Sequence, residues 1–221
     1  PRPLRDVQRQ RRHPRDAEVA VPAPTGLRFE DGVAIMRIAH WDYDEEGKRQ
    51  SAQFSEWMAS IVAAGAKSLI IDIRGNGGGD EVLATELFSY LVSEPFKHYE
   101  CAVFKSDRFS FLKYAGEDPP YATILKDYVK PASPQCRKYA PFELTNRPNL
   151  GVQQPRRPHY GGPVYVLTDG GSFSTSAEFA ALVRAHRRGL IIGQETSGSY
   201  YGSNSWIMPT ITLPESKLSL T

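Results

Sequence analysis

Apolar residues in this sequence never run together for long. No stretch reaches the roughly 18–20 consecutive apolar residues that a membrane-spanning helix needs. No charged segment followed by an apolar one opens the chain, as it would in a secretory signal. We therefore expect no membrane span. The chain begins at Pro1 and not at methionine, which leads us to expect a processed or excised piece of a longer protein.

Net charge is also scarce. The 27 lysines and arginines nearly balance the 25 aspartates and glutamates, for a formal net charge of +2, so bulk charge gives no argument for a nucleic-acid partner. The first 16 residues hold six arginines and only two acidic residues. With three prolines and few apolar side chains, this start cannot bury enough surface to offset its ordering entropy. We predict a flexible basic linker over residues 1–24; an arm that binds nucleic acid or membrane is the alternative.

Cysteine is almost absent. The two cysteines, Cys101 and Cys136, lie in a loop-rich stretch, and the sequence leaves open whether they pair. Two cysteines do not indicate a compartment. The spacing of histidine and cysteine matches no common metal site, so we expect no metal and no cofactor. The oligomeric state is not indicated.

The chain does contain an alternation of strand-like and helix-like segments. Apolar runs predict strands over 32–41, 67–73, 98–104, 163–168, 189–193, 205–213 and 217–221. Helical spacing of apolar residues predicts helices over 51–64, 81–93 and 175–187. This alternation is typical of an α/β domain with a largely parallel sheet, which we place over residues 25–221. No period holds over 105–160, where we predict a variable insertion or lid.

Two glycine-rich loops follow predicted buried strands. Parallel strands put their working residues at their carboxyl ends, so both loops should open toward the same region. In the first, RGNGGG at 74–79, Asp80 and Glu81 stand where a phosphate-binding loop needs lysine and serine or threonine. The dinucleotide fingerprint fails as well, because it needs glycine at position 80. The remaining readings are a plain strand-to-helix turn and a loop whose backbone N–H groups can approach a reacting oxygen.

The second loop, DGGSFSTSAE at 169–178, places Ser174 just before a predicted helix. Backbone N–H groups at the start of a helix favour a developing oxyanion. Thr175 and Glu178 fit a capping box. The alternative, that these hydroxyls only cap the helix, explains Thr175 and Glu178 but not a serine-rich glycine turn at the end of a buried strand.

Taken in order, IDIRGNGGG, VLTDGGSFSTSAEF and GLIIGQETSG resemble the core of the C-terminal-processing and tricorn-like serine peptidases, which retinoid-binding repeats share. The resemblance covers residues 32–220 and implies a crotonase/ClpP-like spiral of ββα units with a mostly parallel sheet. It implies a polypeptide substrate and favours an extracytoplasmic location, periplasmic or secreted. It places the nucleophile at Ser174 and the oxyanion donors at Gly77, Gly78 and the N–H of Thr175.

The general base is where this sequence departs from the resemblance. C-terminal-processing peptidases carry a lysine just after the segment matched here by 193–198, but Ser199 follows, and the next lysine is Lys217. We therefore expect an acyl-enzyme on Ser174 without a Ser-Lys dyad. Tricorn-like relatives use a histidine before the core and a glutamate after it, so we expect the base outside this chain and a fragment that is incomplete and inactive alone. Within the chain, His40 is the candidate base. The alternative function is a non-catalytic module that binds a peptide or a small apolar ligand.

Overall fold

The computed structural model of this chain describes residues 24–42, 50–115, 125, 128–145, 147, 149–203 and 208–220. The basic linker predicted over 1–24 lies outside these ranges except for Pro24.

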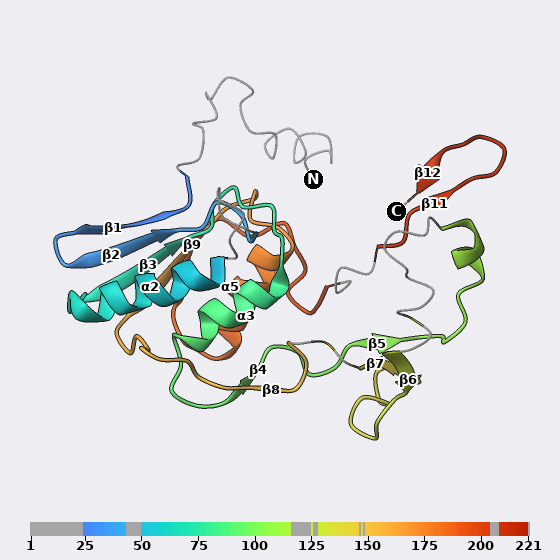
Figure 1. Cartoon of the computed structure of the whole chain (residues 1–221), viewed down its shortest axis with the longest axis horizontal. Helices are drawn as coiled ribbons and strands as arrows, with labels where there is room; N and C mark the ends of the chain where they lie inside the picture. Colours follow the sequence, from blue (N-terminus) through green and yellow to red (C-terminus); the bar gives the residue numbers. More distant parts are fainter. Residues whose placement is uncertain are drawn as a thin grey trace, which may run out of the picture.

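The larger region of the described chain is built around a five-stranded sheet (Figure 1). Its strands are β1 (Gly26–Glu30), β2 (Val33–Arg37), β3 (Ser68–Asp72), β9 (Val164–Thr168) and β10 (Leu190–Gly193). In space their order is β1-β2-β3-β9-β10. The last four run parallel, and β1 pairs with β2 antiparallel at the edge. The predicted α/β class with a mostly parallel sheet is confirmed.

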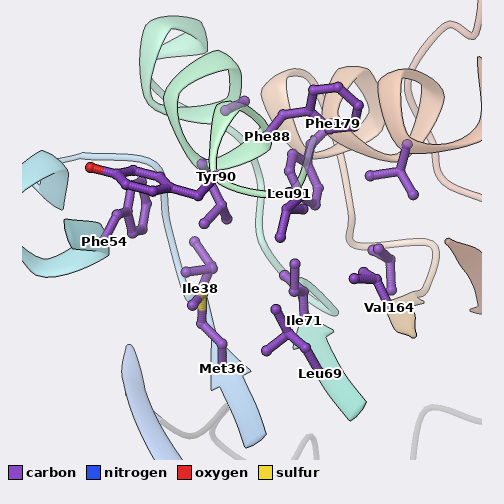
Figure 2. Packing of buried hydrophobic residues seen from close by; sticks show 14 of the residues in the cluster. Met36, Ile38, Phe54, Leu69, Ile71, Phe88, Tyr90, Leu91, Val164 and Phe179 are labelled. Atoms are coloured by element: carbon purple, nitrogen blue, oxygen red, sulfur yellow. The ribbon is translucent and has the colours of Figure 1, made fainter. Parts of the chain in front are cut away.

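Three helices cover one face of this sheet (Figure 1). They are α2 (Gln50–Ala63), α3 (Glu81–Ser89) and α5 (Thr175–Ala185). Met36, Ile71 and Val164 point from the strands toward the helices (Figure 2), where they join Phe88 of α3 and Phe179 of α5 in one buried cluster. Alternate residues of β3 and β9 are less buried, so the strands present one well-packed face and one more open face. All three helices lie where their apolar spacing predicts them.

The edge strand β1 was not among the predicted elements. A two-residue turn at Asp31 and Gly32, both with positive φ, connects it to β2. Turns of this kind match the right-handed twist of paired strands and favour Asp-Gly. The turn sequence was therefore the local signal for the hairpin.

Smaller elements build a second region beside the sheet. They are β4 (Phe96–Lys97), β5 (Val103–Phe104), η1 (Ser110–Tyr114), β6 (Val129–Pro131), β7 (Phe142–Leu144), β8 (Val152–Gln153), β11 (Ile211–Thr212) and β12 (Ser219–Leu220). Strands β5, β7 and β6 form a small sheet, β4 pairs with β8, and β11 pairs with β12. The predicted final strand pair is thus present but shorter.

One prediction for this region is wrong. The strand expected over 98–104 is confined to β5 at its end, because the residues before it turn away: His98 and Tyr99 contact α3 and α5. The stretch 105–160, in which no regular period was found, contains short strands that pack Leu125, Val129 and Leu144 into a small core of their own. Strands of two or three residues are too short to show a period.

A disulfide joins Cys101, just before β5, to Cys136, in the turn between β6 and β7. The sequence left this pairing open. The bond closes a loop across a sequence separation of 35. On the chain-entropy account, a loop of that size stabilises the fold by about 3–4 kcal/mol. No helix in the described ranges combines the length and apolarity needed to cross a membrane.

Candidate active site

Ser174 stands at the junction between the loop after β9 and the start of α5. Its backbone has φ 52° and ψ −122°, a conformation that non-glycine residues rarely adopt and that is found at functional sites. It is the N-cap residue of α5, yet its side chain makes no capping hydrogen bond. The hydroxyl is therefore held at the helix start without being used to stabilise it.

The predicted capping box is wrong. Thr175 Oγ1 donates to the carbonyl of Gly79 at 2.6 Å, and the Glu178 carboxylate accepts a hydrogen bond from Tyr99. Because Ser174, not Thr175, is the N-cap, both side chains of the expected box are available for other contacts. Thr175 joins the two glycine-rich loops, and Glu178 forms part of a cavity wall.

The glycine loop reaches Ser174, as the parallel-sheet argument required. A Cβ atom added at Gly78 would lie 2.6 Å from Ser174 Cβ and 3.2 Å from its Oγ. The φ of Gly78 is +112°, which also favours glycine. The N–H of Phe173 donates to the carbonyl of Asn76 at 3.0 Å. Residues almost a hundred positions apart are thus in contact at Ser174.

The three candidate oxyanion donors differ in what they contact. The N–H of Gly78 donates to Asn76 Oδ1 at 2.9 Å. The N–H groups of Gly77 and Thr175 have no acceptor among the described residues, and both residues line the same cavity as Ser174. Thr175 also lies at the positive end of α5. Gly77 and Thr175 are accordingly the available donors in this geometry, and Gly78 supplies the close approach.

Hydrogen bonds of Trp41 connect the glycine loop to helix α5. The N–H of Trp41 donates to the carbonyl of Gly78 at 3.2 Å, and its own carbonyl accepts from Asp80 N at 2.6 Å. The indole Nε1 donates to Ser176 Oγ at 2.8 Å, and the side chain is fully buried. A Cβ at Gly79 would lie 2.0 Å from the Trp41 carbonyl oxygen. Sequence reasoning placed Trp41 only at the end of a strand and missed this role.

The carboxylate of Asp169 also connects the two glycine-rich loops. Its Oδ1 accepts hydrogen bonds from the N–H of Gly75 at 2.8 Å and of Gly171 at 2.9 Å. Ser172 Oγ, which is buried, donates to the carbonyl of Ile73 at 2.8 Å. One carboxylate therefore fixes the start of both turns. Its position directly before two glycines was the signal in the sequence.

A cavity of about 950 Å³ opens beside Ser174. The described residues that line it include neither a histidine nor a lysine. Ser199, which follows the segment where relatives carry lysine, is one of them. The candidate base His40 is not: it is exposed, and its carbonyl accepts a hydrogen bond from Gln50. The geometry thus brings Ser174, Thr175 and Gly77 together and leaves His40 outside.

Charged side chains form one wall of this cavity. Arg147 pairs with Glu81, and the Tyr99 hydroxyl donates to Glu178 and lies 3.0 Å from Glu81. Burial lowers the pKa of Arg147 to about 10, although Asp80 and Glu178 act in the opposite direction. Burial, followed by the charge of Glu178, raises the pKa of Tyr99. Arg147 comes from the aperiodic stretch and Tyr99 from a predicted strand, and in neither place did a local pattern indicate a contact with this cavity wall.

His98 lies next to this wall of the cavity, and its titration makes the free energy of unfolding depend on pH. Burial, followed by the charge of His186, lowers its pKa from 6.5 to about 4. Between these values the unfolded chain binds a proton that the folded chain does not, so stability falls as the pH drops through this window. We expect a loss of up to about 3 kcal/mol by pH 4. Urea unfolding at pH 7 and pH 4.5 should show a smaller loss in His98→Gln; equal losses in the two proteins would contradict this role.

Within the part of the chain that the structure describes, no three histidine, cysteine, aspartate or glutamate side chains gather as a metal site requires. The acidic residues of the cavity wall are engaged with Arg147 and Tyr99.

The parallel α/β sheet thus holds a serine at a helix start in contact with a glycine loop. The sequence model of peptidase family S41 matches residues 32–219. The chain therefore belongs to peptidase family S41. No curated protein sequence matches it.

Solved structures of mature CPAF share the fold. Mature CPAF in complex with lactacystin has a TM-score of 0.56 at 18% identity, over 99% of this chain and 53% of that one. Mature CPAF alone gives 0.55 at 18% identity, over 86% and 42%. The photosystem II D1 C-terminal processing protease gives 0.44 at 18% identity, over 74% and 31%. The chain thus spans about half of these proteins or less.

Proposed function

We propose that this chain is the nucleophile-bearing core of a serine endopeptidase that hydrolyses polypeptides. Ser174 Oγ attacks the scissile carbonyl carbon, the C–N bond breaks, and an acyl-enzyme forms that water then hydrolyses. The N–H groups of Gly77 and Thr175 stabilise the oxyanion. Membership of family S41 supports the reaction class.

One observation carries the proposal: the contact between Ser174 and the glycine loop at the start of α5. A serine that only capped the helix would accept a hydrogen bond from the first turn. Ser174 does not; its Oγ lies against Gly78 in a cavity with unpaired N–H groups. Nucleophile and oxyanion donors within one cavity are what acyl transfer requires.

The proton acceptor is proposed to come from a segment outside this chain and not from a Ser-Lys dyad. The described cavity lining has no lysine or histidine, and a general base must lie within hydrogen-bond reach of the serine. His40 remains the candidate within the chain if it approaches on substrate binding.

Three further features belong to the proposal. The sheet and helices form part of a crotonase/ClpP-like spiral of ββα units. Residues 105–160 form an insertion that shapes the substrate cleft, because Arg147 lines the cavity of Ser174. The location is extracytoplasmic, which the Cys101–Cys136 disulfide supports, since such bonds persist in oxidising compartments.

Covalent labelling tests the proposal. A fluorophosphonate probe is expected to modify the full-length protein on Ser174, because phosphonylation mimics attack on a carbonyl. Ser174→Ala should abolish labelling, whereas Ser199→Ala, which removes a hydroxyl from the same cavity, should retain it. Peptide mapping of the adduct identifies the modified residue. Labelling that persists in Ser174→Ala would exclude Ser174 as nucleophile.

A binding module for a peptide or small apolar ligand is the second candidate. The lack of a base beside Ser174 in the described part of the cavity favours it. A full-length protein that binds peptides but neither reacts with the probe nor cleaves them would select this alternative.

A further inference from the structure

A second cavity adjoins the one beside Ser174. Its volume is about 900 Å³. The two cavities share Glu178 of α5 and Ser199, Gly202 and Ser203 of the following loop. They are therefore neighbouring parts of one groove, with Ser174 in the first part only.

The second cavity is lined largely by apolar and aromatic side chains. Phe104 of β5, Leu144 of β7 and Leu182 of α5 contribute to it, and Tyr139 and Tyr201 stand at its edge. Tyr201 is 95% exposed and Tyr139 57% exposed. Exposed aromatic groups beside a groove that continues from a reactive serine are typical of a ligand-binding surface.

Helix α5 sets the distance between the two parts. Ser174 is its N-cap, and Ala181 in the second cavity follows seven residues later. At about 1.5 Å per residue of helix, the separation along the axis is about 10 Å. An extended polypeptide covers that distance in about three residues, at about 3.3 Å each.

We propose that the second cavity is a substrate subsite that takes an apolar or aromatic side chain about three residues from the scissile bond. This inference rests on the proposed function, because it places the polypeptide by its reaction with Ser174. The occupant is the same substrate chain, since the groove is continuous with the cavity of the nucleophile. Cys101 also lines the cavity, and the disulfide joins it to Cys136, which stands three residues before Tyr139. The disulfide therefore fixes this wall before substrate arrives.

The test uses alanine-based peptidyl diphenyl phosphonates that react with the nucleophile of the full-length protein. In one series a phenylalanine is placed at successive positions of the peptide amino-terminal to the phosphorus atom; in a second series of mixed phosphonate esters, with one phenoxy group replaced by a peptide attached through oxygen, it is placed at successive positions on the other side. The probe with phenylalanine about three residues away is expected to react about tenfold faster than the all-alanine probe. Equal rates for every position would overturn the subsite. Absence of reaction with all probes would instead count against Ser174 and the proposed function.

Variants of its lining residues test whether the preference for phenylalanine arises in the second cavity. Tyr139→Ala with Tyr201→Ala should reduce the preference for phenylalanine below about threefold. Ala181→Phe, which fills the cavity, should do the same. Tyr114→Ala removes an exposed tyrosine that lines neither cavity and should change nothing. A preference that survives in both cavity variants would refute the proposal.

Sedimentation of the same proteins tests whether a second copy of the chain, and not the substrate, occupies the second cavity. A monomer with the position-dependent rates described above supports the substrate subsite. A dimer that dissociates in the Tyr139→Ala, Tyr201→Ala variant would assign the cavity to a second copy of the chain and overturn the proposal.

Discussion

The 221-residue chain is expected to cleave casein or peptides about 10⁴-fold more slowly than a longer form of the protein that includes the flanking segments. A serine hydroxyl without a base is a weak nucleophile at neutral pH. Loss of one member of a catalytic triad costs about 10⁴–10⁶-fold, while oxyanion donors retain some catalysis. The cavity of Ser174 offers those donors but, among its described residues, no histidine or lysine.

Initial rates on a quenched fluorescent peptide would measure this difference. Ser174→Ala in the longer form should lower its rate to that of the background. Fast, Ser174-dependent turnover by the 221-residue chain would contradict the expectation and place the base inside it; His40→Ala would then be the first variant to make.

Gly78→Ala is expected to lower the rate of fluorophosphonate labelling about 100-fold. The new Cβ would lie 2.6 Å from Ser174 Cβ, so the nucleophile or the glycine loop must move. A displacement of about 1 Å at a reacting group costs about that factor. The positive φ of Gly78 adds backbone strain of about 1–3 kcal/mol in the variant.

Gly170→Ala is the matched control for this change. It lies in the serine loop, and a Cβ there would have no heavy atom within 4 Å. Labelling rates and urea unfolding of both variants should separate an effect on the site from an effect on the fold. If Gly78→Ala reacts like Gly170→Ala, the contact between the loop and Ser174 does not position the nucleophile.

Strong local patterns determined which parts of the fold could be predicted. Strand β3 is a continuous apolar run, and α5 has regular helical spacing, so both were found. The hairpin strand β1 was missed, although two local signals indicated it: Arg28 and Glu30 alternate with apolar residues, and the Asp31-Gly32 turn follows. The short strands after residue 95 were mispredicted, since two or three residues cannot establish a period.

The residues of the candidate site also differ in whether local sequence patterns could locate them. Ser174 and the glycine loop could be predicted because each stands at the end of a buried strand, and parallel strands bring such ends together. Tyr99 and Arg147 could not, because tertiary contacts alone bring them to the cavity. The role of Glu178 was misjudged because the local capping pattern was satisfied in the sequence, whereas the folded chain uses its carboxylate to bind Tyr99.

The hydrogen bonds that hold the two glycine-rich loops together also bear on how relatives of this protein diverge. In the described ranges these bonds involve Trp41, residues 73–80 and residues 169–178. The stretch 105–160 instead contributes Tyr139 and Arg147 to the groove. We therefore expect insertions, deletions and exchanges in that stretch to alter recognition and to leave the placement of Ser174 against Gly78 unchanged.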